Sequence, residues 1–401
     1  MRGVLGVVAE FNPFHKGHSY LLKKAKKITG ADYVICAMSG DYVQRGECAC
    51  VSKYVRAEVA LNFGCDVVLS MPVYCSLSSA GEFAEAYVKA LVNAGIDALA
   101  FGCEDERIGG LMDYIKKHIM GSGSAIDSWA MAYMRMGDPY PVAREKAFRE
   151  LCGMPEEFIE MLRSPNNLLI YEYMRTVCEM GAADRIRMIP IKRIGMAHHD
   201  EEAVGGWIPE YPSGSFIRKK MKAGEDIYDW LSVYRSVHKP LFWRDYSDLL
   251  YYRLLTAPKG ELPQIKDVSE DLAGRITSEF YNFDDPEDYI LRIKNKSVTY
   301  TRISRALMQT LLKLPKRKER PNYCYLLGYR EEAAAVLHEI KKRGRIPMIT
   351  KAADARKQLN WLNCEFYQMD VKANELYVRL ASVPGKEPLL PDYKMQPVIV
   401  K

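Results

Sequence analysis

The stretch "GVLGVVAEFNPFHKGHSYLLKKAKKITG", residues 3–30, indicates a strand, a turn and a helix in that order. Its first part is a short apolar run of the kind found in strands that a parallel sheet buries on both faces. Asn12 and Pro13 predict a turn, and Gly30 ends the helix that follows. In an open parallel sheet, ligands bind beside such a strand-to-helix turn. The stretch therefore predicts both the fold class and the place of a binding site.

The alternation of strands and helices continues along the chain and predicts a parallel sheet covered on both faces. Buried strands are predicted at residues 32–40, 66–72, 97–104 and 185–195, with helices at 52–64 and 80–95. We expect three domains: a catalytic α/β domain at 1–224, a mostly helical domain at 225–318 and a small C-terminal α/β domain at 319–401.

Composition narrows the class of protein. The chain is 48% hydrophobic and 27% charged, values typical of a soluble globular protein, and no apolar run approaches the ~20 residues of a membrane span. The N-terminus lacks a cleavage-site pattern, so we expect a cytoplasmic protein. None of the ten cysteines forms a Cys-x-x-Cys pair, which argues against a zinc site. The net charge of +6 permits an anionic partner.

Two histidines flank a glycine at the first strand-to-helix turn. A helix N-terminus offers free N–H groups, and Gly17 lets a phosphate or an adenine ring approach the backbone. His15 and His18 can then donate hydrogen bonds to a leaving pyrophosphate. The alternative is that both are helix-start residues hydrogen-bonded to the backbone.

A second candidate lies in "YPSGSFIRKKMKAG", residues 211–224. Ser213, Gly214 and Ser215 at a helix start expose N–H groups, and Arg218 can grip a phosphate with two donors. The alternative is an ordinary N-cap followed by a solvated basic face.

Taken together, the His-x-Gly-His and Ser-x-Ser-x-x-Arg motifs resemble the nucleotidyltransferase superfamily of the class I aminoacyl-tRNA synthetase type. The ordered set "VVAEFNPFHKGHSYLL", "MSGDYVQRGE", "FGCE", "SPNNLLIYEY", "IKRIGMAHHD" and "KDVSEDLAGRI" is similar to the tRNA(Met) cytidine acetate ligase family over nearly the whole chain. The resemblance implies a Rossmann-like parallel-sheet nucleotidyltransferase (HUP-type) domain, followed by a helical region and a small C-terminal α/β unit.

The resemblance also implies an activity. Such an enzyme uses ATP and Mg²⁺ to activate acetate as acetyl-adenylate, and it transfers the acetyl group to N4 of the wobble cytidine of elongator tRNA(Met). One alternative is an adenylyltransferase acting on a phosphorylated small metabolite. Another is a non-catalytic RNA-binding protein that keeps ATP as a structural ligand.

Site residues follow from the same resemblance. The implied catalytic residues are His15, His18, Arg193 and Arg218. The implied ATP-binding residues, with the choice between the two asparagines left open, are Val7, Val8, Ala9, Glu10, Phe11, Asn12, Pro13, Phe14, His15, Lys16, Gly17, His18, Ser19, Tyr20, Gly102, Asn166, Asn167, Lys192, Arg193, Ser213, Ser215 and Arg218. We expect no metal held by the protein alone.

A basic run suggests where tRNA binds. Nine Lys or Arg residues and a single acid, Glu319, stand between Lys294 and Arg320. Such a run attracts a phosphate backbone, although a solvated helix face followed by a linker is the alternative. With the resemblance, the tRNA-facing residues would be Lys294, Lys296, Arg302 and Arg305.

The end of the second strand supplies further candidates. Gln44, Arg45 and Glu47 follow this strand and should face the same crevice, on the side of the acceptor nucleotide. Lys53 and Arg56 are expected on the outer face of the next helix, and the alternative is that they are phosphate ligands.

Overall fold

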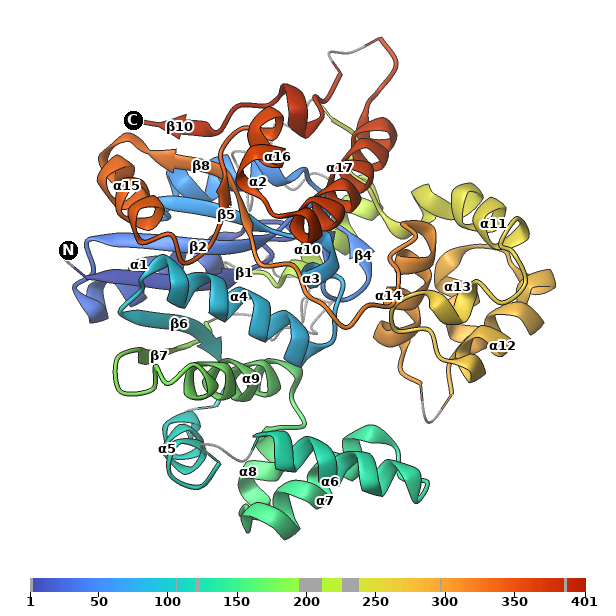
Figure 1. Cartoon of the computed structure of the whole chain (residues 1–401), viewed down its shortest axis with the longest axis horizontal. Coiled ribbons are helices and arrows are strands. Elements are labelled where there is room, and N and C mark those ends of the chain that lie inside the picture. The colour runs from blue at the N-terminus through green and yellow to red at the C-terminus, as the bar shows by residue number, and fades with distance from the viewer. Residues whose placement is uncertain are drawn as a thin grey trace.

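The structure is a computed structural model that describes residues 3–105, 107–119, 123–194, 211–225, 238–295, 298–385 and 388–401. Its centre is an eight-stranded sheet with the strand order β10-β8-β5-β2-β1-β6-β7, in which β9 also pairs with β8 (Figure 1). The strands are β1 (Val4–Ala9), β2 (Tyr33–Ser39), β5 (Val67–Met71), β6 (Ala98–Cys103), β7 (Arg187–Lys192), β8 (Cys324–Arg330), β9 (Met348–Ile349) and β10 (Val398–Val400).

The sheet is buried on both faces because its strands are apolar throughout. In β2, Val34 and Cys36 belong to one core cluster, and Ile35 and Ala37 belong to the other. Helices α1 (Lys16–Thr29), α2 (Lys53–Asn62) and α17 (Trp361–Ala381) contribute to the first cluster; α4 (Ala80–Ala94), α5 (Ile108–His118), α9 (Pro165–Glu179) and α15 (Ala334–Arg343) contribute to the second. Side chains that alternate along one strand thus reach two different cores, which explains the unbroken apolar run.

The site is positioned by the place of β1 in the sheet. This strand pairs in parallel with β2 on one side and with β6 on the other. The following helix, α1, therefore begins at the point where the strand order changes direction, and the strand ends diverge there to leave a crevice. The four strands predicted beyond residue 30 are all present, including the returning strand β7, which pairs with β6.

The C-terminal residues behave differently from the expected small unit. Strand β8 pairs antiparallel with β5, and β9 and β10 pair in parallel with β8. These strands extend the central sheet instead of building one of their own. Two short helices, α3 (Val73–Ser76) and α16 (Ala355–Gln358), complete this side.

The expectation for Lys53 and Arg56 was wrong, because both are buried. Lys53 Nζ lies 2.6 Å from Asp392 Oδ2 and 3.4 Å from Asp41 Oδ2. Arg56 donates to the main-chain oxygens of Ser39, Glu10 and other neighbours. The C-terminal segment thus reaches Lys53 through Asp392, while the ends of β1 and β2 surround Arg56.

Two groups of helices flank the sheet domain in Figure 1. One group, drawn in yellow and orange, contains α11 (Ser247–Leu255), α12 (Glu270–Ser278), α13 (Pro286–Ile293) and α14 (Tyr300–Leu311). The other lies at the bottom of the view and contains α6 (Gly123–Arg135), α7 (Tyr140–Cys152) and α8 (Glu156–Met161). Among the described residues, no helix is long and apolar enough to cross a membrane.

Candidate active site

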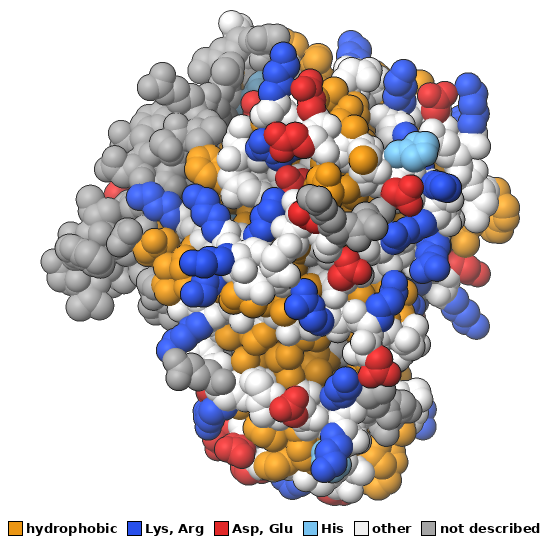
Figure 2. Space-filling view, turned by 90° about the vertical axis from the view of Figure 1, so that its left-hand side faces the viewer, with side chains coloured by type: hydrophobic (Ala, Val, Ile, Leu, Met, Phe, Trp, Pro, Cys, Tyr) orange, Lys and Arg blue, Asp and Glu red, His pale blue; other side chains and the backbone are white. Residues whose placement is uncertain are grey.

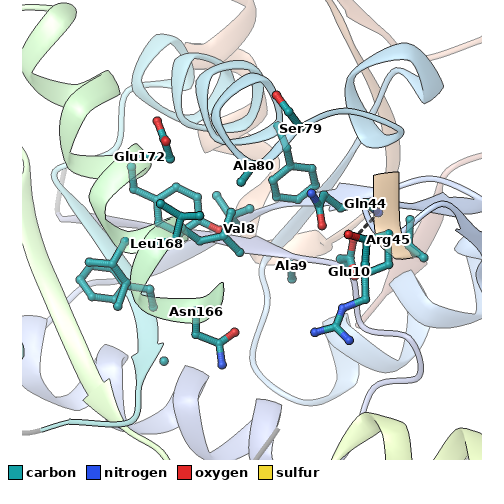
Figure 3. Close-up of a pocket in the computed structure, with 18 of the residues that line it drawn as sticks. Val8, Ala9, Glu10, Gln44, Arg45, Ser79, Ala80, Asn166, Leu168 and Glu172 are labelled. Carbon is teal, nitrogen blue, oxygen red and sulfur yellow. Dashed lines mark hydrogen bonds between the residues drawn. The ribbon is translucent and has the colours of Figure 1, made fainter. Parts of the chain in front are cut away.

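A cavity of about 1070 Å³ lies at the carboxyl ends of β1, β6 and β7. Its walls come from α9, from the start of α10 (Gly214–Lys222), from α14, and from a hairpin of β3 (Tyr42–Val43) and β4 (Glu47–Cys48). The two sides of the pocket are visible in Figure 3: Glu10, Gln44 and Arg45 on one side, and Asn166, Leu168 and Glu172 on the other, with Val8 and Ala9 between them.

His15 and His18 present one ring nitrogen to the helix and the other to the pocket. His15 is the N-cap of α1, and its Nδ1 accepts a hydrogen bond of 3.1 Å from the Gly17 N–H. His18 Nδ1 accepts one of 3.2 Å from the His15 N–H, and the two rings stack 3.8 Å apart. Because Nδ1 is the acceptor in each ring, the proton of the neutral imidazole resides on Nε2. The alternative that we gave, helix-start residues hydrogen-bonded to the backbone, is therefore present, and both rings also line the pocket.

The pKa of His15 is lowered to about 3, first by burial and then by the nearby charges of Arg193 and Arg218. His15 is therefore neutral at pH 7. It can donate a hydrogen bond to a phosphate oxygen, but it carries no positive charge there.

The second predicted turn begins α10. Ser213 is its N-cap, and the Ser213 hydroxyl accepts a hydrogen bond of 3.0 Å from the Phe216 N–H. The Ser215 hydroxyl lies 3.2 Å from Nη2 of Arg218, which donates to it. The N-cap that we gave as the alternative is therefore present, and it orients an arginine into the pocket.

The two turns touch. Arg218 Nη1 donates a hydrogen bond of 2.7 Å to the main-chain oxygen of Asn12. A Cβ atom added at Gly214 would lie 3.4 Å from the same oxygen and 3.9 Å from His15 Nε2. The hydrogen bond thus joins the two turns, and residues of both turns line one pocket.

The residue that follows β7 supplies another cation to the pocket wall. Arg193 follows β7, and burial lowers its pKa. Its Nη1 is 3.7 Å from the Glu104 carboxylate and has no hydrogen-bond partner among the described residues. A Cβ atom at Gly102 would lie 3.4 Å from the Arg193 side chain, which is an ordinary van der Waals distance.

The two asparagines of α9, Asn166 and Asn167, lie in different environments. Asn166 lines the pocket and donates a hydrogen bond to Glu104. Asn167 is buried, donates to the main-chain oxygen of Met161 at 3.0 Å, and is not part of the pocket wall.

Most of the residues predicted to bind ATP line this pocket. Those that do are Val7, Val8, Ala9, Glu10, Phe11, Asn12, His15, Gly17, His18, Tyr20, Gly102, Asn166, Lys192, Arg193, Ser213, Ser215 and Arg218. Those that do not are Pro13, Phe14, Lys16, Ser19 and Asn167. The turn explains the difference, because Phe14 packs into the core and Lys16 is exposed on the first turn of α1.

Glu10 is a half-buried carboxyl group just after β1. Its Oε1 accepts a hydrogen bond of 2.7 Å from the Gln44 N–H. Burial raises the pKa of Glu10, while this hydrogen bond and nearby arginines oppose the rise. Gln44, Arg45 and Glu47 all line the pocket, as the position of their strand predicts.

Sequence reasoning missed a large part of the wall that α9 forms. Leu169, Tyr173 and Thr176 follow Asn166 at helical spacing and line the pocket with it. Glu172, also in the wall, has its pKa raised to about 7 by burial. A 3.6-residue period counted from Asn166 is the signal that could have identified this face.

The predicted tRNA-facing residues lie in different places. Arg302 and Arg305 line the pocket from α14, and Arg305 Nε lies 3.2 Å from Asp267. Lys294 is exposed at the end of α13, and Lys296 lies outside the described residues.

Part of the basic run has a structural role instead. Arg317 pairs with Glu365 at 2.7 Å, and Arg320 pairs with Glu82 at 2.6 Å. The face opposite α11–α14 also carries many Lys and Arg side chains, with Asp and Glu among them (Figure 2). Positive charge alone therefore does not identify an RNA-binding face. Arg302 and Arg305, which line the pocket, are the more specific indication of where RNA binds.

Within the described ranges there is no group of three or more His, Cys, Asp or Glu side chains placed to hold a metal ion.

Comparison with known proteins agrees with this geometry. The family model described as HIGH Nucleotidyl Transferase matches residues 1–387. A tRNA(Met) cytidine acetate ligase from Thermoanaerobacter sp. (strain X514) is 31% identical, over 98% of this chain and 100% of the relative. The enzyme of the same name from Acetivibrio thermocellus is 30% identical, over 95% of this chain and 96% of the relative.

Solved structures give the same result. The apo crystal structure of Thermotoga maritima TmcAL superposes with a TM-score of 0.89 at 27% identity, over 99% of both chains. The crystal structure of the same protein bound with alpha-thio ATP gives a TM-score of 0.87 at 27% identity, again over 99% of both chains. The chain therefore belongs to the tRNA(Met) cytidine acetate ligase family of HIGH nucleotidyl transferases.

Proposed function

We propose that the protein is an ATP-dependent ligase that activates acetate as acetyl-adenylate and transfers the acetyl group to N4 of the wobble cytidine of elongator tRNA(Met). The observation that carries this proposal is the contact between the two turns, in which Arg218 reaches Asn12 beside His15. This contact brings a neutral donor, His15, and a cationic donor, Arg218, from distant parts of the chain to a cavity large enough for ATP. The ATP analogue bound to the Thermotoga relative supports the same ligand.

In the first step, an acetate oxygen attacks the α-phosphorus of ATP and the bond to the bridging oxygen of pyrophosphate breaks. Acetate is ionised at pH 7, so it needs no base, and positioning together with charge stabilisation drives the step. The Nε2–H groups of His15 and His18 would donate to the pyrophosphate oxygens as negative charge grows on them. Arg193 and Arg218 would supply the positive charge that the neutral His15 lacks.

Mg²⁺ fits this site as an ion carried by the triphosphate. It keeps several waters and binds substrate phosphates in preference to an all-protein cage. The described residues offer no such cage, so the phosphate oxygens themselves would hold the ion. Bound there, Mg²⁺ would offset phosphate charge.

In the second step, the N4 amine of cytidine attacks the acetyl carbon, AMP leaves with its phosphate oxygen, and the amine loses a proton. The target base must be unstacked to enter the pocket, which a single-stranded anticodon loop permits. We expect Arg302 and Arg305, together with Lys294 and Lys296, to face the tRNA. In this view residues 1–224 carry ATP and residues 225–318 guide the tRNA.

The decisive experiment incubates the protein with ATP, Mg²⁺, labelled acetate and bulk tRNA, and then looks for label in N4-acetylcytidine. Label in this nucleoside supports the proposal, and ATP consumption without it would contradict the proposal. The two alternatives are tested by partial reactions. An adenylyltransferase for a phosphorylated metabolite would show no acetate-dependent ATP–pyrophosphate exchange. A non-catalytic RNA-binding protein would lose no cytidine acetylation in cells when His18→Ala is introduced.

A further inference from the structure

The hairpin of β3 and β4 has a tip, residues 44–46, that is fixed to the ATP side of the pocket. The Gln44 N–H donates a hydrogen bond of 2.7 Å to Glu10 Oε1 at the end of β1. The side-chain Nε2 of Gln44 donates one of 3.1 Å to the main-chain oxygen of Ser78. The first residue of the tip is therefore bound on both its main chain and its side chain.

The other end of the tip is fixed to α14. The Ser304 hydroxyl donates a hydrogen bond of 2.9 Å to the main-chain oxygen of Gly46, and Trp243 Nε1 donates one of 2.8 Å to this hydroxyl. Gly46 has a φ of 87°, and a Cβ atom there would lie 2.2 Å from the main-chain nitrogen of Arg305. The tip thus fills the space between the end of β1 and the helix that carries Arg302 and Arg305.

Arg45 is the central residue of this tip, and its side chain is part of the pocket wall (Figure 3). Burial is the main cause of the lowered pKa of Arg193, and the charge of Arg45 lowers it further. The same charge opposes the burial-driven rise in the pKa of Glu10. Arg45 therefore lines the same pocket as both groups, on the tip that lies between α14 and the end of β1.

We propose that Arg45 binds the tRNA phosphate next to the target cytidine and so places the N4 amine at the acetyl-adenylate. This inference rests on the function proposed above and adds to it the residue that holds the acceptor nucleotide. A nucleotide entering past Arg302 and Arg305 must pass the tip before its base reaches the end of β1. A planar guanidinium pairs with phosphate through two parallel hydrogen bonds, which fixes orientation as well as position. Pairing with the phosphate leaves the edge of the base that carries N4 free to react.

The experiment uses the full chain and a synthetic anticodon stem-loop of elongator tRNA(Met). One version of the stem-loop is unmodified, and others carry a neutral methylphosphonate at a single linkage, either beside the target cytidine or several nucleotides away. We expect Arg45→Ala to reduce kcat/KM for acetyl transfer to the unmodified stem-loop at least tenfold. This loss should exceed any loss in acetate-dependent ATP–pyrophosphate exchange by at least tenfold. A methylphosphonate at one linkage beside the cytidine should slow the unaltered protein similarly and should slow Arg45→Ala no further.

Each other outcome counts against the inference. Equal losses in exchange and transfer would show that Arg45 supports the pocket as a whole. If the loss from Arg45→Ala and the loss from the methylphosphonate were additive at every linkage, Arg45 would contact no particular phosphate. As a control, Arg187→Ala removes an exposed cation at the amino end of β7, whereas the pocket lies at the carboxyl ends of the strands. This variant should leave both reactions unchanged. If the unaltered protein acetylated no stem-loop and no tRNA, the function itself would fail, which is a different result from a normal Arg45→Ala variant.

Discussion

Arg218 Nη1 lies 2.7 Å from the main-chain oxygen of Asn12, across 206 positions of sequence. The hydrogen bond joins the start of α10 to the turn that follows β1. Because Ser215 holds the other terminal nitrogen of the same guanidinium, the orientation of Arg218 is set from both sides. The side chain proposed to neutralise the triphosphate is therefore also the one that links the two turns of the pocket.

Replacing this arginine should weaken ATP binding. Arg218→Lys keeps the charge but cannot reach both Asn12 and Ser215, so we expect a loss of roughly 10-fold or more in affinity for ATP, measured by calorimetry. Lys219→Ala alters the next residue, which is exposed, and should bind ATP normally. An Arg218→Lys variant with unchanged affinity would show that the guanidinium geometry is not needed.

Substitutions should separate the helix-capping role of His15 from its proposed catalytic role. His15→Ala removes both the N-cap and the Nε2–H donor, so we expect a loss of ~1 kcal/mol in stability and of ~100-fold in ATP–pyrophosphate exchange. His15→Asn restores a capping oxygen without the distant donor. It should recover thermal stability but not exchange, and a variant active in exchange would refute the catalytic role.

The buried His15 should make stability depend on pH. Its pKa falls from 6.5 in the unfolded chain to about 3 in the folded protein, so between these values only the unfolded chain binds the proton. The stabilising contribution is complete above pH 6.5 and is lost as the pH falls toward 3. From pH 7 to pH 5 we expect the unaltered protein to lose ~2 kcal/mol more than His15→Asn, measured by urea unfolding. Parallel losses in the two proteins would contradict this.

Lys53 should be essential for stability. Its side chain is 7% exposed and lies between the carboxylates of Asp41 and Asp392. Lys53→Met leaves these carboxylates buried without their cation, so we expect a loss of ~3–5 kcal/mol in the free energy of unfolding. Lys26→Met breaks the pair with Asp66, in which Lys26 is 39% exposed, and should cost under ~1 kcal/mol. Similar losses in both variants would mean that burial of the ion pair is unimportant.

The sequence indicated the parts of the fold and site that depend on local pattern. The strand of residues 4–9, the capped helix after it and the donors of His15 and His18 all lie within one short stretch, so their geometry follows from neighbouring residues. The contact with Arg218 was inferred only because two motifs matched a known family.

The remaining features depend on long-range packing. The strand at residues 324–330 lies in the predicted C-terminal α/β domain, but its antiparallel pairing with β5 is not encoded in its own residues. Lys53 and Arg56 have the spacing of an exposed helix face, but both are buried. Lys53 pairs with Asp392 of the C-terminal segment, and Arg56 donates to main-chain oxygens of Glu10 and Ser39. The wall formed by α9 was missed because most of its side chains belong to no motif beyond helical periodicity.

The antiparallel pairing of β8 with β5 has a consequence for biosynthesis. β5 leaves the ribosome long before residues 324–330 are translated. Until β8 is made, the N–H and C=O groups on this edge of β5 have no strand partner. During that interval the nascent chain is open to strand exchange with other chains. Truncated products that end before β8 should therefore aggregate, and chaperones that shield strand edges should matter most for this protein while it is being made.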